Sequence, residues 1–269
     1  MRLTTKIILG IIGGIFSLTL LLIIGFSFSD RKDFNSFSEN RRTISQENIV
    51  PIEIGEFKTV RMSYSDNVNP EIRPFFQGTL SISPTSEEDV KQKLFAPEEL
   101  IKYINTSIVN DTLFIRFDQE QMHNDFASQK NEYLQINGMT IRLHTQAVDI
   151  ENTISGMEVN IQDIKTNHIK VRANRVFINS CEATSITPIG SNELRITNST
   201  MHSLNIDSDE VRNWSVENCT IQEENLTGSG HNRNTISKSE AKVMNWIPKN
   251  SDARLDLHLL GEPAKLVFE

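Results

Sequence analysis

Apolar and polar residues alternate with a period of two along most of the chain after residue 50. Leu113, Ile115 and Phe117 show the pattern, and β-branched and aromatic side chains are frequent at the apolar positions. A period of two with this bias predicts β-strands, whose successive side chains point to opposite faces of a sheet. Only Pro97 to Ile104 has a helical pattern, over about two turns. The sequence therefore predicts an all-β protein.

An internal repeat runs through residues 157–227. Four similar segments of four residues each, which we call quartets, recur at spacings of 17, 18 and 20 residues. They are residues 161–164, 178–181, 196–199 and 216–219, and their first members are Ile161, Ile178, Ile196 and Val216. A period near 18–20 residues with short, β-branched apolar clusters is typical of a solenoid. We therefore expect a right-handed parallel β-helix over residues 50–269, in which these four first members stack in the core about 4.8 Å apart.

The third member of each quartet predicts a turn. These four residues are Asp163, Ser180, Asn198 and Asn218. A coil must turn sharply between flat strands, and Asn and Asp tolerate the left-handed backbone that such turns use. We expect the four residues to form a polar ladder along one corner. The alternative is that Asn, Ser and Asp are simply common in β loops.

The chain has two cysteines, too few for a disulfide scaffold or a four-cysteine zinc module. Cys181 and Cys219 are both fourth members of their quartets, and Ser199 has that place in the coil between them. Two coil steps separate their Cα atoms by roughly 9–10 Å, whereas a disulfide needs less than about 7 Å. We therefore expect two separate, buried thiols.

The N-terminal segment has the character of a membrane span. Residues 7–28 contain no charged residue, and a helix of that length crosses a bilayer at about 1.5 Å rise per residue. Residues 1–29 are either a cleaved signal peptide or one retained transmembrane helix, and the length of the run favours the retained anchor. Both interpretations place residues 30–269 outside the cytoplasm. Gly10 and Gly14 have the spacing of a helix–helix dimer motif, although glycine is common in membrane helices anyway.

Residues 30–49 are polar and charged without an apolar period, which is typical of a stalk.

The charge of the chain limits the partners that it can bind. The 269 residues include 27 Lys and Arg against 35 Asp and Glu, which gives a net charge of −8. An acidic surface repels phosphate backbones, so we expect no nucleic-acid partner.

Asp207, Asp209 and Glu210 place three carboxylates within four residues. Calcium prefers such oxygen clusters, so these residues are a candidate calcium site, and calcium is the only cofactor that the sequence suggests. The alternative is an acidic turn that is simply solvated. The six histidines form no pair or cluster with metal-ligand spacing.

The sequence argues against catalysis. A sugar-cleaving β-helix needs two or three carboxylates that face one groove from adjacent coils. The outward positions of the repeat are Gln162, Asn179, Thr197 and Glu217, with one carboxylate among them. We therefore expect a non-catalytic protein. A β-helical polysaccharide lyase or hydrolase stays the alternative, and a purely structural spacer is a further one.

Two segments resemble a known family. They are Phe57-Lys58-Thr59-Val60, and Pro97 to Ile104 running on through Ile108 to Ile115. Together with the Asn/Ser/Thr-rich coils that follow, they resemble the head-GIN domain family of candidate bacterial adhesins over roughly residues 50–230. The family's glycine-rich turns are scarce here, and the last 40 residues have no counterpart. The resemblance implies an envelope-associated β-solenoid with a surface-binding, adhesin-like or structural role, an unidentified glycan or protein ligand, and no established catalytic residues.

Overall fold

The structure is a computed structural model, and it describes residues 41–65, 75–85, 92–127, 134–230, 241–255 and 265–268, together with Ser17 and Thr19. Residues 42–269 form one compact unit. The expected stalk over residues 30–49 is therefore wrong in its last part. β1 (Arg41–Thr43) pairs with β8 (Gln135–His144), and Ile44 is buried in the core, because an apolar side chain gains free energy by leaving water.

The described strands of the compact unit form two β-sheets, as the alternating pattern predicts. Sheet A has the strand order β16 (Trp214–Glu217), β14 (Glu193–Thr197), β12 (Arg175–Asn179), β10 (Met157–Gln162), β4 (Phe75–Ser83), β8, β5 (Lys93–Pro97), β2 (Ile49–Glu53). Sheet B has the order β19 (Lys265–Phe268), β18 (Ala241–Pro248), β17 (Thr220–Gly228), β15 (Thr200–Asp207), β13 (Glu182–Ile189), β11 (Lys165–Arg172), β9 (Asp149–Asn152), β3 (Thr59–Tyr64), β7 (Thr112–Phe117), β6 (Ile104–Val109).

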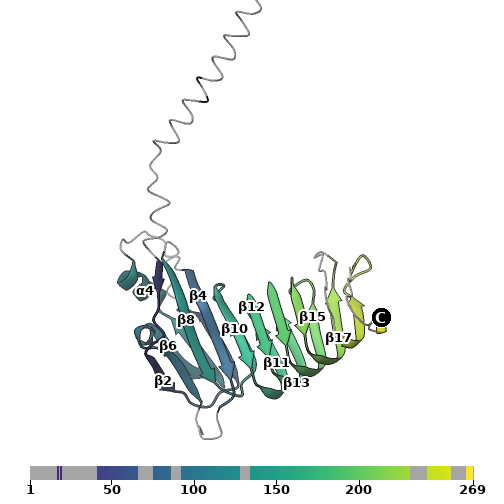
Figure 1. Cartoon of the computed structure of the whole chain (residues 1–269), viewed down its shortest axis with the longest axis horizontal. Coiled ribbons are helices and arrows are strands. Elements are labelled where there is room, and N and C mark those ends of the chain that lie inside the picture. Colours follow the sequence, from purple (N-terminus) through teal and green to yellow (C-terminus); the bar gives the residue numbers. More distant parts are fainter. Residues whose placement is uncertain are drawn as a thin grey trace, which may run out of the picture. The chain divides into compact units, whose positions relative to one another are not determined.

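From β9 to β17 the strands alternate between the two sheets, and from β11 on each strand pairs in parallel with the strand two before it. Ile161 pairs with Ile178, Ile178 with Ile196, and Ile196 with Val216. All four side chains are at most 1% exposed. The repeat therefore corresponds to a stack of parallel strands with one apolar row in the core. Figure 1 shows β8, β4, β10 and β12 side by side in sheet A.

The expected fold class, a right-handed parallel β-helix after one transmembrane helix, is wrong, because both sheets are mixed. β5 runs antiparallel to β2 and β8, and β6 runs antiparallel to β7. Asn110 and Asp111 are the two residues between β6 and β7, and both have positive φ. Such a short connection can only join antiparallel strands, whereas parallel strands need a crossover. These antiparallel strands lie in the first half of the chain, outside the repeat.

No helix in the described ranges is long and apolar enough to cross a membrane. The expected span over residues 7–28 lies outside the described residues, apart from Ser17 and Thr19, and so do Gly10 and Gly14 of the expected dimer motif.

The described part of the compact unit has two short helices. α3 (Glu98–Ile101) lies inside the predicted helical segment. α4 (Gln119–Phe126) was not expected, because its apolar residues are too few to show a helical period. Its N-terminus is capped by Asp118, whose side chain accepts a hydrogen bond from the backbone N–H of Gln121 at 2.9 Å.

Candidate functional site: a polar groove on sheet B

The outward face of sheet B carries a row of amides. Asn205, Asn225 and Asn245 lie in β15, β17 and β18. In each strand the residues before and after the asparagine are buried in the core, so the asparagine points outward. The strand register pairs Asn205 with Asn225 and Asn225 with Asn245. Thr187 continues the row on β13. We call these four residues the amide row.

Hydrogen bonds between side chains join the amide row from end to end. The amide of Asn245 donates to Oδ1 of Asn225 at 2.7 Å, and the amide of Asn225 donates to Oδ1 of Asn205 at 2.9 Å. Asn205 in turn donates to Oγ1 of Thr187 at 3.4 Å. Each bond uses one N–H of one amide and one lone pair of the next oxygen. A primary amide has two N–H groups and two lone pairs, so every asparagine keeps hydrogen-bonding capacity for a ligand.

A groove of about 690 Å³ follows the amide row. Ile189 of β13 and Ile247 of β18 also line it, and Ile247 is 40% exposed. Its charged lining residues are Arg172, Asp207 and Glu210. The groove thus combines hydrogen-bonded amides, several apolar residues and three charged residues.

Lys249 lies between two of the three carboxylates that were predicted to bind calcium. Its Nζ is 2.6 Å from Oδ1 of Asp207 and 3.0 Å from Oδ2 of Asp209. The structure does not bring Glu210 to this ammonium group. Within the described ranges, no group of three or more His, Cys, Asp or Glu is arranged to hold a metal ion.

Asp207, Asp209, Ser229 and Lys249 form a hydrogen-bonded cluster, and their contacts shift the pKa values of Lys249 and Asp209. The pKa of Lys249 is raised, mainly by its hydrogen bond to Asp207. Burial alone would raise the pKa of the Asp209 carboxyl, but hydrogen bonds from Ser229 and Lys249 outweigh it, so that pKa is lowered. The backbone N–H of Ser229 lies 3.0 Å from Asp209 Oδ1, and its hydroxyl donates to the same atom at 2.8 Å. The cluster therefore ties the segment after β17 to the turn after β15.

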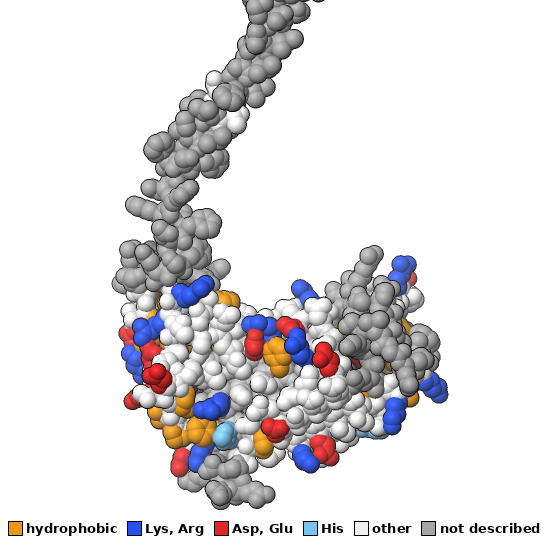
Figure 2. All heavy atoms as spheres, in the orientation of Figure 1, with side chains coloured by type: hydrophobic (Ala, Val, Ile, Leu, Met, Phe, Trp, Pro, Cys, Tyr) orange, Lys and Arg blue, Asp and Glu red, His pale blue; other side chains and the backbone are white. Residues whose placement is uncertain are grey.

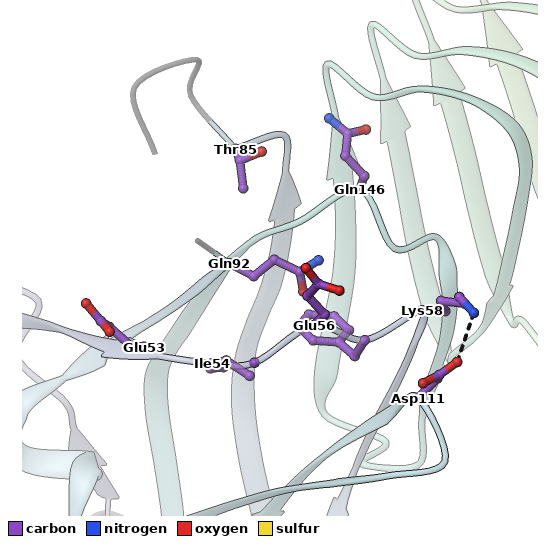
Figure 3. Close-up of a pocket in the computed structure, with 10 residues that line it drawn as sticks. Glu53, Ile54, Glu56, Lys58, Thr85, Gln92, Asp111 and Gln146 are labelled. Atoms are coloured by element: carbon purple, nitrogen blue, oxygen red, sulfur yellow. Dashed lines mark hydrogen bonds and ion pairs between the residues drawn. The ribbon is translucent and has the colours of Figure 1, made fainter. Parts of the chain in front are cut away.

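A second cavity, of about 780 Å³, lies where the chain passes from β2 to β3 (Figure 3). Glu56 and Gln92 both line it, and Lys58 points to Asp111. Nζ of Lys58 is 2.9 Å from Oδ2 of Asp111, and this hydrogen bond is the main reason why the pKa of Lys58 is raised. Both side chains of the pair are well exposed, and exposed ion pairs contribute little free energy. Among the described residues that line this cavity, no hydrogen-bonded row of the kind found on sheet B is present.

The outward face of sheet A differs from that of sheet B. Most of the surface over its strands in Figure 2 is neither charged nor apolar. It carries two ion pairs: Arg175 is 2.6 Å from Glu158, and Arg195 is 3.5 Å from Glu193. Arg195 also lies over the ring of Phe177, 5.8 Å from its centroid. These four charged residues thus have partners within the protein.

The predicted outward row of the repeat lies on sheet A. Gln162 pairs with Asn179, Asn179 with Thr197, and Thr197 with Glu217. Thr197 donates its hydroxyl to Oδ1 of Asn179 at 2.8 Å. Glu217 is the one carboxylate in this row.

The predicted turn residues all have left-handed backbones. Their φ angles lie between 51° and 58°, at Asp163, Ser180, Asn198 and Asn218. All four are exposed. Asn198 also donates its side-chain amide to Oδ1 of Asn179 at 3.0 Å, so it bonds to the neighbouring coil.

The two cysteines are free thiols, and Ser199 lies between them. The hydroxyl of Ser199 accepts from the backbone N–H of Cys181 at 3.0 Å, and the backbone N–H of Ser199 is 3.5 Å from Sγ of Cys219. Cys181 is buried, whereas Cys219 is only partly buried. Burial raises the pKa of the Cys181 thiol.

The amide row was missed in the sequence, although it leaves a signal there. Asn205-Ile206, Asn225-Leu226 and Asn245-Trp246 recur at intervals of 20 residues. Each asparagine precedes an inward apolar residue. The quartets are the clearer repeat, and their register extends to β16 only, so they do not lead to β18.

No family model matches the chain, and no curated protein matches it. The compact fold does resemble solved structures. A candidate adhesin from Bacteroides fragilis is 11% identical, with 84% of this chain and 98% of that chain covered, and a TM-score of 0.43. A candidate adhesin from Parabacteroides merdae is 11% identical, with 85% and 99% covered and a TM-score of 0.29. A candidate lipid-binding protein from Parabacteroides distasonis is 10% identical, with 85% and 99% covered and a TM-score of 0.34.

Adhesin candidates from Bacteroides and Parabacteroides are thus among the proteins that this chain is similar to. Membership of the head-GIN family has no support from a family model. The three TM-scores are below 0.5, so these likenesses carry no argument about the function of this chain. Its function has to be argued from its own residues.

Proposed function

We propose that this protein is a non-catalytic binding module whose ligand lies in the groove along the amide row of sheet B. The observation that supports this proposal is the chain of side-chain hydrogen bonds from Asn245 through Asn225 to Asn205. These bonds hold each amide in one orientation while leaving a donor and an acceptor free. A ligand then meets groups that are already ordered, which lowers the entropic cost of binding.

The contacts of Asp207 favour binding over hydrolysis. Both of its carboxylate oxygens lie within hydrogen-bond distance of Nζ of Lys249. Glu210 is the other carboxylate that lines the groove. Hydrolysis of a glycosidic bond needs two carboxyl groups, one acting as acid and one as base or nucleophile. Because Asp207 is held by Lys249, the groove does not offer two carboxyl groups free of an ion pair.

The N-terminal sequence supports a location for this activity. The uncharged run over residues 7–28 favours a position of the rest of the chain outside the cytoplasm. We therefore propose that the groove acts at the cell envelope or surface, where a binding module meets extracellular ligands.

The proposal is tested by the binding of the full-length chain, immobilised on a surface, to fluorescently labelled bacterial and epithelial cells. Asn225→Leu removes the central amide and both of its row hydrogen bonds. We expect at least a tenfold loss of apparent affinity, equivalent to about 1.4 kcal/mol. Asn245→Ala, at the end of the row, removes only one of these bonds and should have a smaller effect.

Asn160→Leu is the matched control, because Asn160 is also half-buried and points outward, but from β10 of sheet A. It should leave binding unchanged. Equal binding by Asn225→Leu and wild type would overturn the proposal, and absence of any binding would favour a structural spacer. Turnover of a polysaccharide that Glu210→Gln abolishes would favour the lyase or hydrolase instead.

A further inference from the structure

We infer that the ligand of the groove is a neutral oligosaccharide chain that lies along the amide row, an inference that rests on the proposed function. The row offers a donor and an acceptor at each asparagine, repeated from strand to strand. Adjacent hydroxyl groups of a sugar offer the complementary pair, since each hydroxyl both donates and accepts. A row of amides at regular intervals can therefore bind a sugar chain whose pairs of adjacent hydroxyl groups also repeat.

The length of the row favours an extended chain over a single sugar. Thr187, Asn205, Asn225 and Asn245 lie on four adjacent strands of sheet B. Three strand steps of about 4.8 Å give a row of roughly 14 Å. A sugar ligand that contacts every asparagine must therefore be several rings long.

The apolar side chains of the groove fit the same ligand. Ile189 lies on β13 and Ile247 on β18, so they lie on strands at the two ends of the amide row. Sugar rings present C–H groups on their faces and hydroxyls at their edges. The amides would bind the edges, and the isoleucines would contact the C–H faces and remove them from water.

The charges of the groove argue against acidic polymers. Asp207 is paired with Lys249, so the remaining charged lining residues are Arg172 and Glu210, which have opposite signs. The whole chain carries a net charge of −8. A polyanion would be repelled by the protein and would gain one arginine, whereas a neutral chain avoids that repulsion.

A peptide strand is also a poor fit for this surface. Peptides often bind by adding a strand to an unpaired sheet edge. The two central residues of the amide row, Asn205 and Asn225, lie on β15 and β17. Each of these strands is paired on both sides within sheet B. Their backbone groups are used in the sheet, so the groove offers side chains only.

Affinity gel electrophoresis of the full-length chain tests the ligand class. Native gels are cast with a neutral polysaccharide whose residues carry vicinal diols (mannan, dextran or xylan) or with an acidic one (polygalacturonate or alginate). We expect at least one neutral polysaccharide to retard wild type and Asn160→Leu, with at least tenfold weaker retardation of Asn225→Leu. Ile247→Ser should weaken it several-fold. Retardation by the acidic polymers alone, lost in Arg172→Ala, would overturn the neutral class.

The cell-binding assay separates a failure of this inference from a failure of the proposed function. Periodate treatment of the cells, which cleaves vicinal diols, should abolish the binding that depends on Asn225, and protease treatment should not. If that binding survives periodate and is lost after protease, the ligand is a protein and the glycan inference is wrong, while the binding function stands. If no binding depends on Asn225, both are wrong.

Discussion

Replacing Ile196 with alanine tests the core register of the parallel strands. Ile196 is fully buried and pairs with Ile178 on one side and Val216 on the other. Truncation of a buried isoleucine to alanine costs about 2–5 kcal/mol, depending on how far the site can collapse around the cavity. The neighbouring strands are held at the strand spacing by backbone hydrogen bonds, so the cavity cannot close. We therefore expect a loss in the upper part of this range, about 3–5 kcal/mol.

Urea unfolding followed by circular dichroism measures this loss. Ile247→Ala is the matched control, because it makes the same change at a side chain that is 40% exposed. Surface substitutions of this kind usually change stability by about 0.5 kcal/mol or less. Similar losses in the two variants, or a loss below about 1 kcal/mol for Ile196→Ala, would mean that the apolar row does not form the core.

Three further predictions concern single side chains. Because the folded-state pKa of Asp209 is lowered, its ionised form stabilises the fold above the ordinary carboxyl pKa, and this stability is lost as the pH falls toward the folded value. Asp209→Asn should therefore be less stable than wild type at pH 7, and the difference between their urea midpoints should vanish in acid. Alkylation of the unfolded chain without reductant should label both Cys181 and Cys219, and an unlabelled mass would contradict the separation of the two thiols. Asn198→Val should lower the free energy of unfolding by about 1–2 kcal/mol more than Asn198→Gly, because both variants lose the hydrogen bond to Asn179 but only valine is strained in the left-handed backbone; equal losses would exclude that cause.

The strands of the second half of the chain could be predicted because their information is local. Side chains alternate along a strand, so buried positions such as Ile178 and Ile196 appear in the sequence as a period of two. Parallel stacking then places residues of successive strands side by side at nearly constant sequence spacing. The register between these strands therefore follows from the repeat itself.

The antiparallel strands of the first half could not be predicted in the same way. The alternating pattern around Leu113 and Ile115 is the same whether a strand pairs in parallel or antiparallel. The orientation is decided by the connection, and Asn110-Asp111 makes a turn too short for a crossover. A prediction that relied on the repeat extended the parallel order into a segment whose turns do not allow it.

The candidate site could not be predicted from local sequence patterns either. The acidic run at Asp207 and Asp209 is plain in the sequence, but its partner Lys249 is 40 or more residues away and reaches it only through the fold. The amide row likewise depends on β18 lying next to β17, which no local pattern specifies. Within the repeat, the sequence by itself determined the strands, the apolar core row and the four left-handed turns, because these properties depend on near neighbours. Only the tertiary structure decided which distant side chains meet, because that depends on the path of the chain between them.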